Sequence, residues 1–121
     1  MFRIIIFTSS DQEYADTVID KLDHMNCIYD RLYRHDLTWD GGSVCKDIQK
    51  KSKDISQCLI IDDTPEYIKH KENFIYISPF LGFDTEDKAL MNLVDFFKEE
   101  IKGREAEFDL RTLASKYSSK K

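Results

Sequence analysis

Short stretches of apolar, β-branched and aromatic residues alternate with longer amphipathic stretches along the chain. Each short stretch lacks helical periodicity and is the length of a strand. We therefore predict four strands, at residues 2–7, 27–33, 58–62 and 74–77. The stretches between them are long enough for crossover helices, so the pattern predicts an α/β fold with a mostly parallel sheet.

The first amphipathic stretch predicts a helix from about Asp11 to Asp23, because apolar residues recur there at helical spacing. Ser10 and Glu13 have the spacing of a capping box at its start. Beyond it, residues 34–39 are expected to continue in extended form. Asp40-Gly41-Gly42-Ser43 then gives a strong turn signal, which predicts an antiparallel hairpin inserted into the parallel fold.

A second helix is predicted to begin at Asp84 or Thr85 and to have Gly103 as its C-cap. Its apolar face is expected to consist of the residues that share one side at helical spacing: Ala89, Leu90, Leu93, Val94, Phe97 and Ile101. A further short helix is expected over residues 107–113. We expect one domain over residues 1–115 and a disordered basic tail at 116–121.

The predicted strand at residues 58–62 is followed by two adjacent acids, Asp62 and Asp63. An unbroken apolar run of this length is typical of a strand buried on both faces, and ligands of open α/β sheets bind at the carboxyl ends of such strands. Two neighbouring carboxylates repel each other, and a hard cation such as Mg²⁺ would keep both ionised. The alternative is an acidic turn in which Asp62 or Asp63 caps the next segment.

The 121 residues carry a net charge of −5, and the tail at 116–121 contributes +3, so the remainder carries −8. This balance argues against a nucleic-acid partner, which needs a basic surface. No apolar run is long enough for a membrane span, and no signal-peptide pattern is present. Cys27, Cys45 and Cys58 have neither disulfide nor metal-site spacing, which favours a reducing, intracellular compartment. We expect Cys58 to be a buried strand residue.

Three separated segments carry groups that together could hold a phosphoryl group. Thr8 follows the first strand, Lys46 follows the hairpin, and Asp62 and Asp63 follow the third strand. A hydroxyl and an ammonium can hold phosphate oxygens, and a cation on the acids can neutralise charge. Alternatively, Lys46 is an ordinary exposed lysine, and Thr8 only helps to start the helix that follows it.

Eight short pieces occur in an order that resembles a known family. They are F-T-S-S at 7–10, Y-A-D at 14–16, L-D at 22–23, R-L-Y-R at 31–34, G-S-V-C-K-D-I at 42–48, L-I-I-D-D-T-P at 59–65, E-N at 72–73 and F-D-L-R at 108–111. Nearly the whole chain, from residue 2 to about 113, is similar to the RNA polymerase II C-terminal-domain phosphatases. These form the small serine/threonine phosphatase branch of the haloacid dehalogenase superfamily.

The resemblance implies a haloacid-dehalogenase-like, Rossmannoid three-layer fold with a small antiparallel hairpin insertion. It implies that Thr8 and Lys46 bind phosphate, that Asp62 and Asp63 hold Mg²⁺, and that Tyr14 and Arg34 line the peptide side of the pocket. Simple helix packing for Tyr14 and a surface ion pair for Arg34 are the alternatives. The implied substrate is a phosphorylated Ser/Thr peptide or protein, in the nucleus or the cytoplasm.

The first motif of the family, D-x-D-x-[TV], has no counterpart in the 121 residues, since no Asp lies two positions after another. The family's first Asp is the nucleophile, so we expect no turnover by this chain alone through an aspartyl-phosphate. The central first strand is expected to be missing as well. The flanking strands would then pair with each other or with a complementing N-terminal segment or a second copy, or the chain is a truncated gene product.

The main alternative is a non-catalytic peptide-binding module. It would resemble the mitochondrial inner-membrane presequence receptor, which keeps the fold and binds peptides, and a mitochondrial location would go with it. A third option is a flavodoxin-like or receiver-type domain with an acid-pair Mg²⁺ site. That option leaves the hairpin and the closing Asp-Leu-Arg at 109–111 unexplained.

Overall fold

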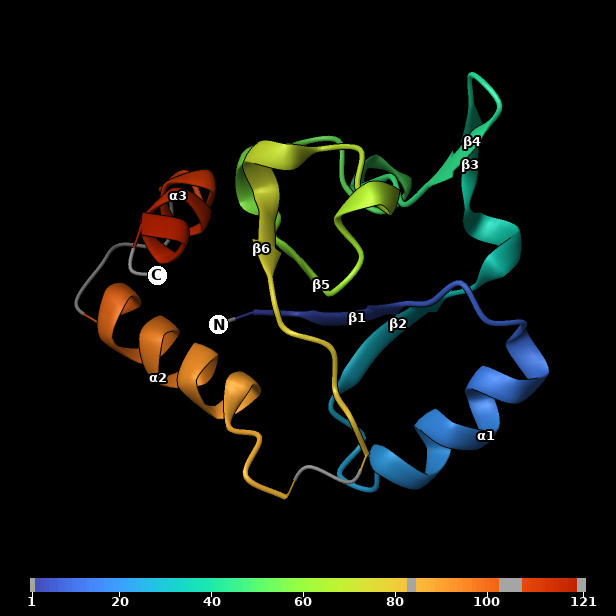
Figure 1. The fold of residues 1–121 in the computed structure, drawn as a ribbon, viewed down its shortest axis with the longest axis horizontal. Helices are drawn as coiled ribbons and strands as arrows, with labels where there is room; N and C mark the ends of the chain where they lie inside the picture. Colours follow the sequence, from blue (N-terminus) through green and yellow to red (C-terminus); the bar gives the residue numbers. More distant parts are fainter. Residues whose placement is uncertain (1, 83–84, 103–107, 120–121) are drawn as a thin grey trace. The chain divides into compact units, whose positions relative to one another are not determined.

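The computed structural model describes residues 2–82, 85–102 and 108–119 (Figure 1). It divides the chain into two compact units, residues 1–47 and residues 48–121, where the sequence predicted one domain. Each unit builds its own cluster of buried residues around its own pair of parallel strands. We refer to them as unit 1 and unit 2.

Unit 1 is built on strand β1 (Ile4–Phe7), which pairs in parallel with β2 (Ile28–Leu32). Helix α1 (Gln12–Leu22) connects them. The helix buries Ala15 and Ile19, which pack with Tyr33 against partly buried Ile6 and Ile28. The two strands and the helix predicted for this part of the chain are therefore confirmed, with slightly shorter bounds.

The start of α1 differs from the predicted capping box. Asp11, not Ser10, is the N-cap, and its carboxylate accepts the N–H of Tyr14 at 2.9 Å. Ser10 instead donates its own N–H to the hydroxyl oxygen of Thr8 at 3.1 Å. The prediction of a Ser10 cap was wrong because a better acceptor lies one residue later.

The antiparallel hairpin is confirmed. Strands β3 (Thr38–Asp40) and β4 (Ser43–Cys45) are joined by two glycines with φ of 58° and 84°. Both glycines occupy the left-handed region, which other residues adopt at a cost. Before the hairpin, residues Arg34–Asp36 form a short 3₁₀ turn (η1) instead of extended chain, because Asp36 turns back to accept the Tyr33 N–H at 2.8 Å.

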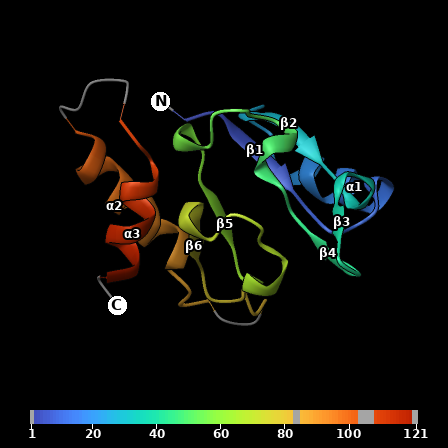
Figure 2. The same cartoon turned by 90° about the horizontal axis from the view of Figure 1, so that it is seen from above.

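Unit 2 contains strand β5 (Ile60–Asp62), which pairs in parallel with β6 (Phe74–Tyr76). Helices α2 (Ala89–Ile101) and α3 (Arg111–Ser119) lie side by side and cover β6 (Figures 1 and 2). Single 3₁₀ turns lie at Ile48–Lys50 (η2), Ile55–Gln57 (η3), Pro65–Tyr67 (η4) and Lys71–Asn73 (η5). The buried core of this unit consists of Ile75, Leu93, Phe96, Leu110, Leu113 and Ala114.

Helix α2 begins later than predicted, because the Asp87 carboxylate accepts the N–H of Ala89 at 2.9 Å and the helix starts only there. Its buried face agrees with the prediction at Leu93, Phe97 and Ile101 and differs at other positions. Phe96 is buried against Tyr117 of α3, with ring centroids 4.9 Å apart, whereas Leu90 and Val94 are 64% and 48% exposed. The predicted C-cap Gly103 and the predicted helix start at residue 107 lie outside the described residues.

Helix α3 runs to Ser119 and so includes four residues that were predicted to belong to a disordered tail. Tyr117 packs on the core of unit 2, and Lys116 pairs with Glu100 at 2.8 Å. These two contacts are the physical reason why the helix continues past residue 115. The structure thus differs here from the expected end of the folded domain.

Strand β5 is not buried on both faces as predicted. Ile60 is 8% exposed, but Ile61 is 38% exposed although its register partner Ile75 is fully buried. The helices cover β6 rather than β5, which leaves Ile61 partly open. Cys58 is only partly buried and lies before the strand, as the C-cap of η3.

The α/β class is confirmed, with parallel pairs and an antiparallel hairpin. Among the described residues each sheet holds two strands, so β1 pairs with β2 and β5 with β6. Pairing of β1 with β5 would join the two units and stays a prediction. A complementing segment or a second copy beside them remains a prediction.

A charged cluster fixes α1 to β2 in unit 1. The Arg31 guanidinium donates to Asp16 and to Asp20, both at 2.8 Å, and the Tyr33 hydroxyl donates to Asp16 at 2.5 Å. The hydrogen bonds from Tyr33 and then Arg31 hold the pKa of Asp16 below its ordinary value, and the bond to Asp16 raises the pKa of Tyr33. These hydrogen bonds therefore stabilise the ionised carboxylate of Asp16 over its protonated form.

Replacing Asp16 by Asn is expected to lower the stability of unit 1 at neutral pH. It is also expected to reduce the loss of that stability on acidification. The folded pKa of Asp16 lies below its unfolded value, so its contribution is present above about pH 4 and is lost as the pH falls through the folded pKa. Amide exchange in α1 and β2 at pH 7 and below pH 4 measures both effects. Asp20→Asn, at a 69% exposed side chain, is the control and should have the smaller effect. Equal acid sensitivity of Asp16→Asn and the unmodified chain would contradict this account.

Candidate functional site

Thr8 lies directly after β1, in the turn that leads into α1. Its N–H donates to the carbonyl of Leu32 at 3.0 Å, which fixes the residue beside the end of β2. Its hydroxyl oxygen accepts the Ser10 N–H at 3.1 Å, so the hydroxyl proton can be donated to another group. The side chain is partly buried, and it lies at the carboxyl end of a parallel strand pair, where ligands of α/β folds bind.

Arg34 is attached to the same turn from the other side. Its backbone N–H donates to the carbonyl of Ser10 at 2.9 Å, and its side-chain Nε donates to the carbonyl of Ser9 at 2.9 Å. These bonds orient an exposed guanidinium next to the residues that follow Thr8. The structure therefore brings Arg34 and the Thr8 turn together, and the alternative of a simple surface ion pair has no support in the contacts described.

Lys46 follows β4 and is only 7% exposed. The alternative of an ordinary exposed lysine does not hold, because a lysine buried to this degree needs partners for its ammonium group. Tyr14 is different: it lies in the first turn of α1 with 64% of its surface exposed. It does not pack into the core of unit 1, whose helix residues are Ala15 and Ile19.

Asp62 ends β5, and its backbone carbonyl accepts the Ile77 N–H at 3.0 Å. Its carboxylate oxygen Oδ1 accepts both the N–H of Thr64 at 2.9 Å and the Thr64 hydroxyl at 2.5 Å. Asp62 thus caps the turn into η4, as the acidic-turn alternative expects. Asp63 is exposed next to it.

The acid pair supplies a small set of hard oxygen donors. Within the described ranges, no group of three or more His, Cys, Asp and Glu residues could hold a metal ion. Two carboxylates fit Mg²⁺ better than Zn²⁺, because Mg²⁺ keeps several waters and is commonly held by one or two carboxylates together with phosphate oxygens. The donor chemistry of Asp62 and Asp63 therefore fits the predicted ion.

The predicted site residues fall in both units. Thr8, Tyr14, Arg34 and Lys46 lie in unit 1, and Asp62 and Asp63 lie in unit 2. The contacts within unit 1 join Arg34 to the Thr8 turn. Convergence of Thr8, Lys46 and the acid pair on one phosphate stays a prediction.

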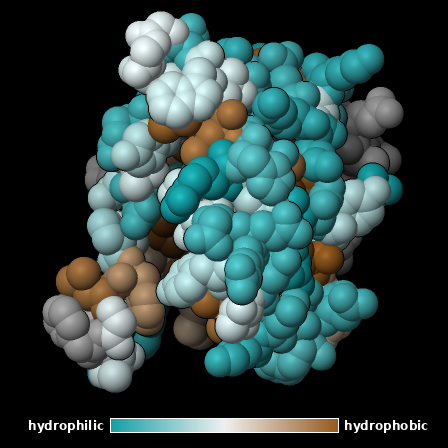
Figure 3. Space-filling view, turned by 90° about the vertical axis from the view of Figure 1, so that its right-hand side faces the viewer, coloured by the Kyte–Doolittle hydropathy of each residue, from teal (hydrophilic) through white to brown (hydrophobic). Residues whose placement is uncertain are grey.

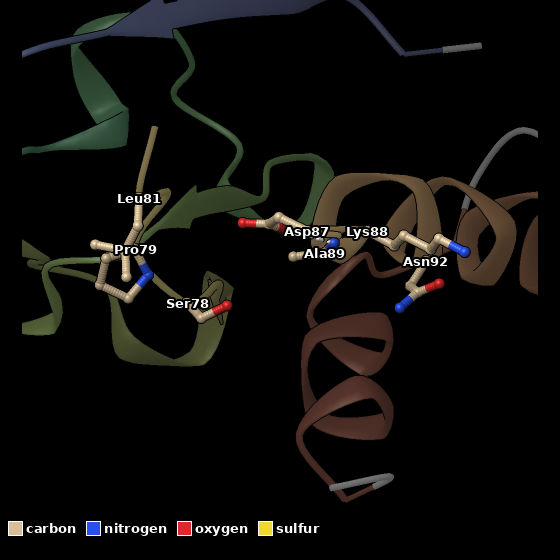
Figure 4. A pocket seen from close by; sticks show the side chains of 7 residues that line it. All are labelled: Ser78, Pro79, Leu81, Asp87, Lys88, Ala89 and Asn92. Carbon is tan, nitrogen blue, oxygen red and sulfur yellow. Dashed lines mark hydrogen bonds between the residues drawn. The ribbon is translucent and has the colours of Figure 1, made fainter. Parts of the chain in front are cut away.

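A shallow hollow of about 530 Å³ lies near the carboxyl end of β6 (Figure 4). It is lined by residues from the stretch after β6 and from the start of α2: Ser78, Pro79, Leu81, Asp87, Lys88, Ala89 and Asn92. Ile77, which bonds to the carbonyl of Asp62, directly precedes Ser78. The hollow is therefore linked to the end of β5 through that backbone bond, but its lining includes none of the predicted site residues.

Hydrophilic side chains cover most of the face drawn in Figure 3, and hydrophobic atoms appear between them in small separate areas. In the part of the chain that the structure describes, none of the helices combines the length and the apolar character needed to cross a membrane.

Comparisons with known proteins agree with the resemblance found in the sequence. Residues 1–111 match the family model described as NLI interacting factor-like phosphatase. The human carboxy-terminal domain RNA polymerase II polypeptide A small phosphatase 2 is 35% identical over 106 residues, which are 87% of this chain and 38% of that protein. The zebrafish CTD nuclear envelope phosphatase 1B is 37% identical over 95 residues, or 77% of this chain and 38% of that protein. The chain spans less than two fifths of the length of these two relatives.

Proposed function

Because the chain belongs to the NLI interacting factor-like phosphatase family, we propose that it forms the phosphate-binding and Mg²⁺-binding part of a protein serine/threonine phosphatase domain. The observation that carries this proposal is the family match over residues 1–111. That range contains every residue that the sequence analysis assigned to phosphate or metal: Thr8, Lys46, Asp62 and Asp63.

In this proposal, Thr8 and Lys46 hold oxygens of the phosphoryl group. The hydroxyl of Thr8 has its proton available, and the turn that contains it is held by Arg34. A buried ammonium such as that of Lys46 interacts with an anion in a medium of low dielectric constant, where the attraction is stronger than in water. Arg34 and Tyr14 are placed on the side of the flanking peptide.

Asp62 and Asp63 would hold the Mg²⁺ ion. When bound, the ion supplies charge neutralisation for the phosphoryl oxygens. Asp62 is already held in one orientation by its two bonds to Thr64, so little side-chain freedom would be lost on binding.

The proposed substrates are phosphoserine and phosphothreonine in protein segments, and the proposed compartment is the nucleus or the cytoplasm. Support comes from the names of the relatives, which refer to the carboxy-terminal domain of RNA polymerase II and to the nuclear envelope. Turnover through an aspartyl-phosphate requires a D-x-D-x-[TV] segment in addition, because the 121 residues contain no Asp-x-Asp. We therefore propose that these residues alone bind phosphate and Mg²⁺ without turnover.

Titration of the 121-residue chain with Mg²⁺ and with phosphate tests the proposal, together with an assay of p-nitrophenyl phosphate hydrolysis. We expect binding of both ions and no hydrolysis. Asp62→Asn is expected to weaken Mg²⁺ binding by about tenfold or more, since a neutral amide replaces an anionic ligand. Glu66→Gln, at an exposed acid four residues away, is the matched control. Hydrolysis by this chain, or equal Mg²⁺ affinity of Asp62→Asn, would overturn the proposal.

A peptide-binding module without catalysis is the second candidate, favoured by the absence of Asp-x-Asp from these residues. It predicts that a peptide binds equally well with and without a phosphoryl group, and that free phosphate does not compete. A phosphatase domain predicts instead that the phosphorylated peptide binds more tightly and that free phosphate competes with it.

A further inference from the structure

Asn73 is a fully buried polar residue for which the sequence pattern predicts no role. Its exposure is 0%, and it lies directly before β6. The side-chain Nδ2 donates to the carbonyl of Ile55 at 2.5 Å and to that of Cys58 at 3.0 Å, while Oδ1 has no hydrogen-bond partner in the described structure. A buried acceptor without a partner destabilises a fold, so the two donated bonds must provide a compensating benefit.

These bonds lie at the amino ends of the parallel strand pair. Asn73 immediately precedes Phe74, whose register partner is Ile60, and Cys58 lies two residues before Ile60. The bond from Asn73 to the Cys58 carbonyl therefore connects the two strands before their backbone ladder begins. In effect, the side-chain amide adds one more cross-connection to a short sheet.

The ladder itself is short, since each strand has only three residues. A short parallel pair has few hydrogen bonds to specify its register, and a shift of one residue would turn each side chain to the opposite face. The observed register places Asp62 opposite Tyr76, and the Asp62 carbonyl accepts the Ile77 N–H. The register therefore decides where the carboxylate of Asp62 points.

Other bonds hold the η3 turn but do not join it to β6. The Leu110 N–H donates to the Ser56 carbonyl at 2.7 Å, and Gln57 Nε2 donates to the Phe108 carbonyl at 2.9 Å. Both connect the turn to the segment before α3. The bond between Asn73 and Cys58 differs from them because it lies between the two strand entrances.

We propose that Asn73 is a positioning residue for the metal-binding acids. Its amide fixes the register of β5 against β6 and so holds Asp62 and Asp63 where they bind Mg²⁺. This inference rests on the proposed function for its Mg²⁺ part, whereas the register part stands on the hydrogen bonds and can be measured without any metal.

The test compares Asn73→Ala and Asn73→Ser with the control Gln57→Ala, which removes a bond of the same turn that does not reach β6. Folding of each variant is checked by its circular dichroism and thermal midpoint. Two quantities are then measured well below that midpoint: Mg²⁺ affinity, and amide exchange of the Ile77 N–H, the last cross-connection of the ladder. Asn73→Ser retains one hydroxyl donor and covers the case in which Asn73→Ala does not fold.

We expect both Asn73 variants to bind Mg²⁺ about tenfold more weakly, the lower end of what residues that orient metal ligands contribute. We also expect faster exchange at Ile77, with neither change in Gln57→Ala. A folded Asn73→Ser protein with unchanged exchange at Ile77 and unchanged Mg²⁺ affinity would overturn the inference. If the unmodified chain binds no Mg²⁺, the proposed function fails instead, and Ile77 exchange alone decides whether Asn73 sets the register.

Discussion

Replacing Lys46 by Met is expected to weaken phosphate binding by the 121-residue chain by roughly 10- to 100-fold. Met keeps an unbranched apolar stem, which can stay packed at a position that is only 7% exposed. The variant loses the ammonium group that we assign to the phosphate oxygens. Hydrogen bonds to charged groups contribute about 1.5–3 kcal/mol, which corresponds to a loss of roughly 10- to 100-fold in affinity. Titration with phosphate or vanadate measures it.

Lys50→Met provides the matched control for Lys46. Lys50 lies four residues later, in η2, and is exposed. The two variants carry the same change in net charge, so a loss of binding confined to Lys46→Met identifies a local contact and not a general reduction of positive charge. Equal losses in both variants, or unchanged binding in Lys46→Met, would remove Lys46 from the site.

Leu113→Ala is expected to destabilise unit 2 by about 3 kcal/mol, because truncating a buried leucine removes apolar contacts and leaves a cavity. Leu113 is 1% exposed and belongs to the core cluster that also contains Ile75 and Phe96. Urea unfolding followed by circular dichroism measures the effect. A loss this large is a substantial part of the stability of a small domain.

Leu90→Ala makes the same chemical change on α2, at a residue that is 64% exposed. We expect its effect to stay within about 0.5 kcal/mol, as for other surface substitutions. A similar loss in both variants would mean that Leu90 is covered in solution by something that the described contacts do not include.

Local patterns in the sequence predicted those elements whose formation depends on neighbouring residues. The apolar run before Asp62 predicted a strand, and the glycines at 41–42 predicted a tight hairpin, since few other residues adopt their backbone angles. The amphipathic spacing after Asp11 predicted α1. In each case the periodicity or the turn chemistry is contained within a dozen residues.

Features that depend on distant residues were not predictable in the same way. Periodicity alone suggested Leu90 and Val94 for the buried face of α2, but the face is set by Tyr117 of α3, which packs on Phe96. Similarly, the bonds of Asp16 to Arg31 and Tyr33 span 15 and 17 residues. Nothing in the local sequence around Asp16 indicates such partners.

In the candidate site, too, the residue types could be predicted from the sequence but their surroundings in the fold could not. The type of residue needed at Thr8, Lys46 and the acid pair could be inferred from chemistry and family resemblance. The deep burial of Lys46 and the bonds from Arg34 to the Thr8 turn became known only from the structure. The role of Asn73 had a weak signal, an amide-bearing residue directly before a predicted strand, which is meaningful only once Ile55 and Cys58 are seen beside it.

The packing of Tyr117 against Phe96 has a practical consequence for recombinant work. A fragment that ends at residue 115, where the sequence alone suggested a boundary, would expose one side of Phe96 and remove the Lys116 pair with Glu100. Expression vectors for this chain should therefore extend at least through Ser119, and affinity tags at the carboxyl terminus need a spacer beyond that helix.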